Sequence, residues 1–92
     1  MRKLQFSLHA LKRMVERDAS PAQVRVVVEA DDCIEEYPDD KPSPARLLFG
    51  IVDGRALHVV AARASDELTV IVTVYEPDPA RWDATLRKRV TE

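Results

Sequence analysis

Hydrophobic positions near the start of the chain recur at helical spacing. At about 100° per residue, one side of a helix carries five apolar residues: Leu8, Ala10, Leu11, Met14 and Val15. Ser7 is a suitable N-cap, so the pattern predicts a helix from Leu8 to about Asp18. We expect the apolar side of this helix to pack in the core and the polar side to face solvent.

A second helix start follows after a short break. Ser20 can cap, Pro21 suits the first helical position, and Gln23 completes a capping box. The run 24–28 is rich in β-branched residues and also suits a strand, but the cap favours a helix. Its core face then holds Val24, Val27 and Val28.

Beyond Asp32 the helical spacing gives way to short apolar runs. They predict four strands: Cys33–Tyr37, 46–52, Arg55–Arg63 and 67–75. The prolines of 38–44 indicate a loop, and Asp53-Gly54 is typical of a two-residue hairpin turn. The segment 79–90 predicts a last helix with Trp82 and Leu86 on one side.

These elements predict an α+β fold in a single domain, 1–92. Two N-terminal helices pack on one face of a four-stranded antiparallel sheet, followed by a short C-terminal helix. Alternation along the last strand places two sets of residues on opposite faces: Leu68, Val70, Val72 and Val74 towards the core, and Ile71, Thr73 and Tyr75 on the other face, where Thr73 and Tyr75 line a groove. We expect one shared core of Leu11, Val15, Val70 and Val72.

Composition narrows the functional classes. The net charge of −2 is unlike that of a general nucleic-acid binder, although the acids concentrate in 29–40 and cations precede and follow that block. Cys33 is the single cysteine, which excludes an internal disulfide and fits a reducing cytoplasm. No apolar run reaches membrane-spanning length, so we expect no membrane partner.

The polar side of the first helix is the first candidate site. His9, Arg13 and Glu16 lie at its centre, flanked by Lys12 and Arg17. The positive end of the helix dipole favours a neutral imidazole at His9. A neutral imidazole beside a guanidinium suits attack on a phosphodiester, with His9 as the base and Arg13 holding the phosphate. The alternative is an ordinary solvated helix face.

The sheet offers further candidates. His58 shares a fairly apolar strand face, where it is either structural or the acid partner of His9. Thr73 and Tyr75 are expected to line a groove in which the tyrosine stacks on a base, or simply packs. The two distant histidines and the cysteine have no zinc spacing, and Gly50 and Gly54 form no phosphate loop, so we expect no metal and no cofactor.

An ordered series of motifs covers nearly the whole chain: 6–17 (FSLHALKRMVER), 34–38 (IEEYP), 57–60 (LHVV) and 73–82 (TVYEPDPARW). The series resembles a domain family of unassigned function from small bacterial and archaeal proteins, which is distantly similar to the BrnT and RelE toxins of type II toxin–antitoxin systems. The resemblance marks seven residues: His9, Arg13, Arg17, Tyr37, His58, Tyr75 and Trp82.

The resemblance implies a compact RelE/BrnT-like ribonuclease fold that is independent of metal. It also implies an antitoxin partner, of zinc-finger or helix-turn-helix type, and RNA cleavage through 2′-hydroxyl attack. Catalysis would use His9, Arg13, His58 and Tyr75, and substrate binding would use Lys12, Arg17 and Thr73. The hypothesis is therefore a cytoplasmic toxin-like endoribonuclease, with a homodimer left open. Two alternatives are a non-catalytic protein-interaction module and a small nucleic-acid-binding regulator without activity.

Overall fold

The computed structural model describes residues 3–41 and 43–90, so Pro42 of the predicted loop lies outside the described part. Seven elements follow one another along the chain: β1 (Lys3–Phe6), α1 (Leu8–Arg17), α2 (Pro21–Ala30), β2 (Cys33–Tyr37), β3 (Ala45–Val52), β4 (Arg55–Arg63) and β5 (Leu68–Tyr75). The two helices and the last four strands match the predicted order, and the boundaries that the sequence predicts differ by at most one residue; the end of the second helix was not among them.

The sheet has five strands in the order β1-β5-β4-β3-β2, and β1 pairs with β5 in parallel. The prediction of a four-stranded antiparallel sheet is therefore wrong. β1 is only four residues long, and its ladder to β5 connects positions more than sixty residues apart, such as Lys3 and Leu68. A short edge strand of this kind leaves no local pattern, because its pairing partner defines it.

The caps confirm the predicted helix starts. The Ser7 hydroxyl accepts a hydrogen bond from the amide of Ala10 at 3.0 Å. Ser20 and Gln23 form the reciprocal capping box. Both helices end at an aspartate in the left-handed region, Asp18 with φ 54° and Asp31 with φ 53°. These signals are local in sequence, which is why the pattern alone located them.

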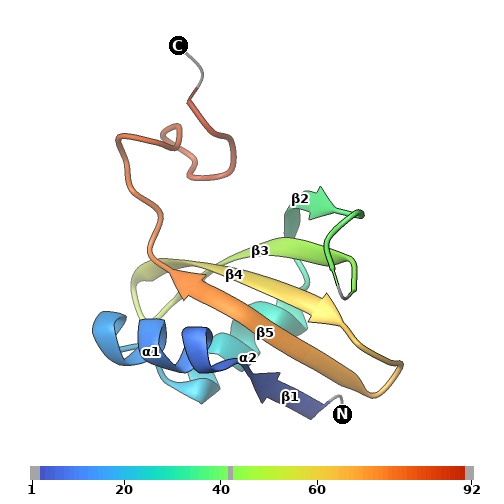
Figure 1. Cartoon of the computed structure of the whole chain (residues 1–92). Coiled ribbons are helices and arrows are strands. Elements are labelled where there is room, and N and C mark those ends of the chain that lie inside the picture. Colours follow the sequence, from blue (N-terminus) through green and yellow to red (C-terminus); the bar gives the residue numbers. More distant parts are fainter. Residues whose placement is uncertain (1–2, 42, 91–92) are drawn as a thin grey trace.

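Both helices cover the same side of the sheet (Figure 1), with α1 against β5 and α2 against β3 and β4. The core between them contains side chains from both helices and three strands: Ala10, Met14, Ala19, Val24, Val27, Leu48, Val52, Leu57, Val59, Ala61, Ile71 and Val74. Gly50 lets α2 approach β3, since a Cβ there would lie 2.9 Å from Val27 Cγ2. The packing of α2 thus depends on the absence of a side chain in β3.

The core side of α1 differs from the predicted side. Ala10 and Met14 are buried, whereas Leu8 and Val15 are 84% and 82% exposed. The rotation is set where α1 begins, because the Ser7 amide and hydroxyl donate to the carbonyls of Ile71 and Val72 at 3.0 and 2.9 Å. This non-local attachment outweighs the apolar stripe that the sequence shows.

A β-bulge changes the alternation of β5. Val60 pairs with Thr73, but the next residue of β4 pairs with Ile71, so Val72 has no partner in the ladder. Ile71 and Val74 both reach the core, and Val72 is 38% exposed. The predicted core of Leu11, Val15, Val70 and Val72 is therefore wrong, as is the placement of Ile71 on the face opposite the core. Thr73 and Tyr75 do share the face away from the helices.

The predicted C-terminal helix is also wrong. Residues 78–90, which we call the covering segment, form turns and one isolated bridge between Trp82 and Arg89. Trp82 is buried against the sheet instead of aligning with Leu86 along a helix. Figure 1 shows the segment on the side of the sheet away from the helices. No helix of the described residues is long and apolar enough to cross a membrane.

Candidate functional site

Three rings form a row across the sheet face that the helices leave open. Phe49 of β3 pairs with His58 of β4, which pairs with Tyr75 of β5. The Phe49 and His58 ring centroids are 5.7 Å apart, and those of His58 and Tyr75 are 5.2 Å apart, both in edge contact. We call these three residues the ring row. Its middle member, His58, is fully buried.

Both ring nitrogens of His58 are bound. Nε2 lies 2.8 Å from the carbonyl oxygen of Leu86, and Nδ1 lies 3.2 Å from the Tyr75 hydroxyl. A carbonyl only accepts, so Nε2 carries the proton of the neutral imidazole. Nδ1 then accepts from Tyr75, which fixes the direction of the tyrosine hydroxyl. His58 thus connects β5 to the covering segment.

Burial controls the acid–base state of this pair. It lowers the pKa of His58, although the hydrogen bond to the Leu86 carbonyl acts in the opposite direction. Burial also raises the pKa of Tyr75. At neutral pH the imidazole is neutral and the phenol keeps its proton, which is the state that their hydrogen bond requires.

The covering segment closes the ring row from outside. The Trp82 ring stands at 90° to the His58 ring with the centroids 4.4 Å apart. The Arg87 guanidinium lies over Phe49 at 5.6 Å, and that of Arg89 lies over Trp82 at 4.7 Å. Aromatic and cation–π contacts therefore hold the segment to the sheet.

Ion pairs connect the covering segment to β2 and the residue before it. Arg87 makes two hydrogen bonds to Asp32 at 2.6 and 2.7 Å, and these lower the pKa of the Asp32 carboxyl. Arg89 Nε donates to Glu35 at 3.1 Å. Part of the acidic block seen in the sequence is thus paired with arginines from a distant segment.

Tyr37 belongs to the same cluster and donates to Glu35 at 2.7 Å. Burial alone would raise the pKa of Glu35, but the hydrogen bonds from Tyr37 and Arg89 bring it below its ordinary value. Burial and the adjacent carboxylate raise the pKa of Tyr37 to about 12. Tyr37 therefore serves here as a fixed hydrogen-bond donor.

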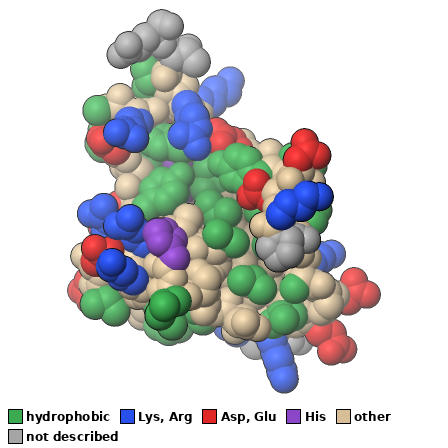
Figure 2. Space-filling model, in the orientation of Figure 1, with side chains coloured by type: hydrophobic (Ala, Val, Ile, Leu, Met, Phe, Trp, Pro, Cys, Tyr) green, Lys and Arg blue, Asp and Glu red, His purple; other side chains and the backbone are tan. Residues whose placement is uncertain are grey.

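The remaining predicted residues lie on α1. His9, Lys12 and Arg17 are exposed, and Arg13 makes an exposed ion pair with Glu16 at 3.1 Å. In Figure 2, lysine and arginine side chains and a histidine gather over α1 and the adjoining end of β5. This part of the surface is consistent with the basic helix face that the sequence predicts. We call His9, Lys12, Arg13 and Arg17 the α1 cationic face.

The structure brings some predicted residues together and separates others. His58 and Tyr75 are in contact, and Trp82 adjoins them. Among the described residues, His9 has no hydrogen-bond or ion-pair partner, and the predicted acid–base pair of His9 with His58 is not in contact. The Ser7 bond to Val72 nevertheless places the start of α1 beside the part of β5 that leads to Thr73 and Tyr75.

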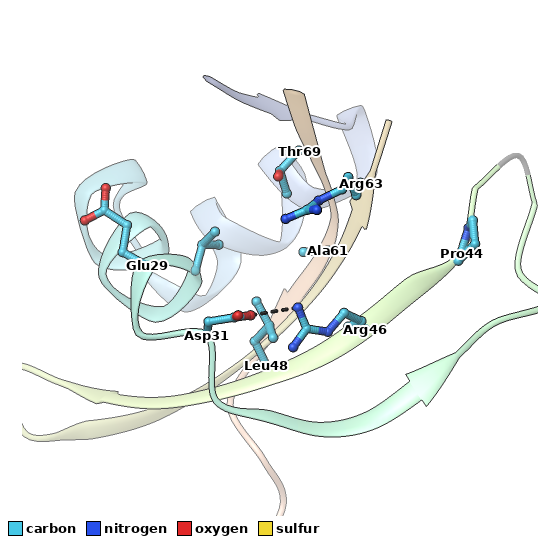
Figure 3. A pocket seen from close by; sticks show the side chains of 9 residues that line it. Glu29, Asp31, Pro44, Arg46, Leu48, Ala61, Arg63 and Thr69 are labelled. Carbon is cyan, nitrogen blue, oxygen red and sulfur yellow. Dashed lines mark ion pairs between the residues drawn. The ribbon is translucent and has the colours of Figure 1, made fainter. Parts of the chain in front are cut away.

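A separate cavity of about 640 Å³ opens on the helix side of the sheet. Figure 3 shows it between the end of α2 and the strands, with Arg46 paired to Asp31 at 2.8 Å and with Arg63 and Thr69 on another wall. It is lined by none of the residues that the sequence predicts as catalytic or substrate-binding. Within the described residues, no group of three His, Cys, Asp or Glu side chains is placed to hold a metal ion.

Sequence reasoning missed Phe49, although a signal for it exists. A two-residue turn at Asp53-Gly54 pairs Val52 with Arg55, and counting back along the hairpin pairs Phe49 with His58. Arg87 and Arg89 gave no such signal. Their positions depend on a segment that folds back from the far end of the sheet, and neither spacing nor capping specifies that contact.

Comparison with known proteins gives one family match. A model described as "Domain of unknown function (DUF4258)" matches residues 6–76. The matched range contains both helices, the ring row and the α1 cationic face, and it ends before the covering segment. No curated protein and no solved structure matches the chain.

Proposed function

Since the chain belongs to the DUF4258 family, whose function is unknown, we propose its activity from its own geometry: a metal-independent endoribonuclease of a toxin–antitoxin system. The observation that carries the proposal is the exposed His9 in the first turn of α1 with cations one and two turns further along. This arrangement presents a base and phosphate-binding groups on one accessible surface.

In the proposed reaction, His9 takes the proton of a ribose 2′-hydroxyl. The O2′ then attacks the adjacent phosphorus, and the bond from phosphorus to the 5′-oxygen breaks. The imidazolium formed at His9 returns its proton to the leaving 5′-oxygen, which balances the step. Arg13, Lys12 and Arg17 hold the phosphate, and the Arg13–Glu16 pair is exposed enough to exchange for it.

His58 and Tyr75 take a positioning role in this proposal. The sequence suggested His58 as the acid partner, but a buried imidazole with a lowered pKa holds too little imidazolium at neutral pH to donate from it. Its bond to Tyr75 instead fixes the phenol. Tyr75 and Thr73 then orient the RNA beside α1. This assignment places the chemistry at His9 and the positioning of RNA on the sheet.

The test is cleavage of RNA by purified protein in the presence of EDTA. His9→Ala should lower the cleavage rate by about 10²–10⁴-fold, the usual loss for a positioned base. Arg13→Lys should also lower it, because lysine lacks the bidentate fork. Lys41→Ala, which removes an exposed cation from the loop between β2 and β3, is the matched control and should cleave normally. Equal rates for wild type and His9→Ala would rule the proposal out.

A second candidate function is protein interaction, and one observation favours it. Leu8, Leu11 and Val15 form an apolar stripe on α1 and are 84%, 43% and 82% exposed. Such a stripe fits an amphipathic helix of a partner. The partner proposed here is an antitoxin of the zinc-finger or helix-turn-helix type, in the cytoplasm. This role and the nuclease role use different sides of the same helix.

A further inference from the structure

The covering segment has little regular structure of its own. Its two limbs lie side by side through the Trp82–Arg89 bridge, with the Val90 amide donating to the Arg81 carbonyl at 2.9 Å. Leu86, whose carbonyl binds His58, has φ 61°, a conformation that side-chain-bearing residues seldom adopt. Further local hydrogen bonds, such as that from the Asp83 amide to the Lys88 carbonyl at 2.8 Å, fold the segment on itself, so it can leave the sheet as one unit.

Most attachments of the segment are of the kind that exchange readily. The side chains of the Arg87–Asp32 pair are 42% and 40% exposed, and those of the Arg89–Glu35 pair are 55% and 27% exposed. Exposed ion pairs usually add little to stability, and the bidentate geometry makes Arg87–Asp32 the stronger of the two. Trp82 is the one large side chain of the segment that is buried. The segment is thus held by the buried Trp82, by the hydrogen bond from His58 to the Leu86 carbonyl, and by solvent-exposed contacts of its arginines.

The surface under Trp82 has the features of a nucleobase-binding site. Phe49, His58 and Tyr75 offer three rings in register on neighbouring strands, with hydrogen-bonding groups at His58 and Tyr75. The planar guanidinium of Arg87 already lies on the Phe49 ring. Stacking on aromatic rings is how single-stranded nucleic acids bind without regard to sequence.

We propose that the ring row is a binding site for an unpaired base of single-stranded RNA, and that the covering segment is a built-in occupant which RNA displaces. When the segment leaves, Trp82 moves into water and a base stacks in its place. An oxygen of the base takes over the proton of His58 Nε2 from the Leu86 carbonyl. The identity of RNA as the ligand rests on the proposed nuclease function.

Charge supports RNA as the ligand. Displacement separates Arg87 and Arg89 from their carboxylates, so the released segment carries two unpaired guanidinium groups that can pair with phosphates of the bound strand. In the view of Figure 2, lysine and arginine side chains are visible both at the C-terminal end of the chain and beside α1. Asp32 and Glu35 return to water as the segment leaves.

Trp82 makes the proposal measurable, because it is the single tryptophan of the chain. A short 2′-O-methyl oligoribonucleotide, which lacks the reacting hydroxyl, is titrated into the full chain while tryptophan emission is recorded. We expect a saturable red shift and stronger quenching by acrylamide as Trp82 leaves its buried position. A fluorescent label on the oligonucleotide measures binding independently through its anisotropy.

Two variants and a matched control sharpen the test. Asp32→Asn loosens the segment without removing a cation, so it should tighten oligonucleotide binding by up to about fivefold. Asp39→Asn makes the same charge change in an exposed loop and should have a much smaller effect. Phe49→Leu keeps an apolar side chain but removes the ring, and should weaken binding by about tenfold or more.

The outcomes separate this proposal from the nuclease. Oligonucleotide binding with an unchanged Trp82 signal overturns the displacement, even if His9-dependent cleavage occurs. Equal affinities of Asp32→Asn and Asp39→Asn overturn it as well. A clear change in the Trp82 signal without His9-dependent cleavage supports the base site and contradicts the proposed nuclease function. Absence of oligonucleotide binding overturns the base site.

Discussion

The two histidines of this chain occupy opposite environments. His9 is exposed near the start of α1 with no partner among the described residues, whereas His58 is fully buried and has both ring nitrogens bound. An exposed imidazole without a partner can meet a substrate directly, whereas a buried imidazole with both nitrogens bound holds its neighbours in place. The comparison teaches that residue type alone does not assign a role, because accessibility and hydrogen bonding decide it.

The largest expected difference between the two sites is in stability. His58→Ala leaves a cavity and removes two hydrogen bonds, so it should cost about 2–4 kcal/mol of unfolding free energy. His9→Ala should change that free energy by less than about 0.5 kcal/mol. Urea denaturation of both variants measures this. Similar losses in the two variants would contradict the contrast in their environments.

The second largest effect is expected in the pH dependence of stability, which reports on the buried His58. The pKa of folded His58 lies below the ordinary value of about 6.5, so the unfolded chain binds more protons. The stability from this residue is present above that value and is lost as pH falls through it towards the folded pKa. We expect the urea midpoint of the wild type to fall as the pH drops below about 6.5.

Two variants isolate the source of this loss. His58→Gln keeps a side-chain donor for the Leu86 carbonyl but does not titrate, so its midpoint should be flatter across the same pH window. Leu8→Ala, which changes an exposed side chain without an ionisable group, should keep the wild-type dependence. An unaltered slope in His58→Gln would mean that other groups cause the loss.

The smallest expected effect on stability lies on the apolar stripe of α1. Leu8→Lys and Val15→Lys should each change the unfolding free energy by less than about 0.5 kcal/mol, because both side chains are more than four-fifths exposed. Met14→Lys, on the buried side of the same helix, should be strongly destabilising. Thermal melts of the three variants compare them directly. A large loss of stability in Leu8→Lys or Val15→Lys would mean that these side chains pack in the core.

The parts of the fold that the sequence predicted are those with local signals. The serine caps and the Asp53-Gly54 turn depend on residues within a few positions of each other, and all three are confirmed. The errors concern distant contacts. β1 is defined by β5, the rotation of α1 by the Ser7 bonds, and the placement of Trp82 by the ring row.

The candidate site shows the same contrast between local signals and distant contacts. Exposure of His9 followed from the helix pattern, because the polar side of α1 needed only its own spacing. The surroundings of His58 required knowledge of which segment covers the strand. No spacing in β4 indicates that Leu86 and Trp82 lie there. The bulge at Val72 could not be predicted either, because the residue types of the strand do not indicate which of them is left without a partner in β4.

The parallel pairing of β1 has a consequence for the exposure of β5 in the folded protein. β5 reads LTVIVTVY, a run of β-branched residues without charge or proline, which is the type of segment that templates amyloid-like stacking. β1 and α1 shield that edge. The opposite edge, β2, carries an irregular register and two glutamates, which oppose strand addition. The four residues of β1 therefore occupy the edge of β5 that would otherwise be open to pairing with a strand of another molecule.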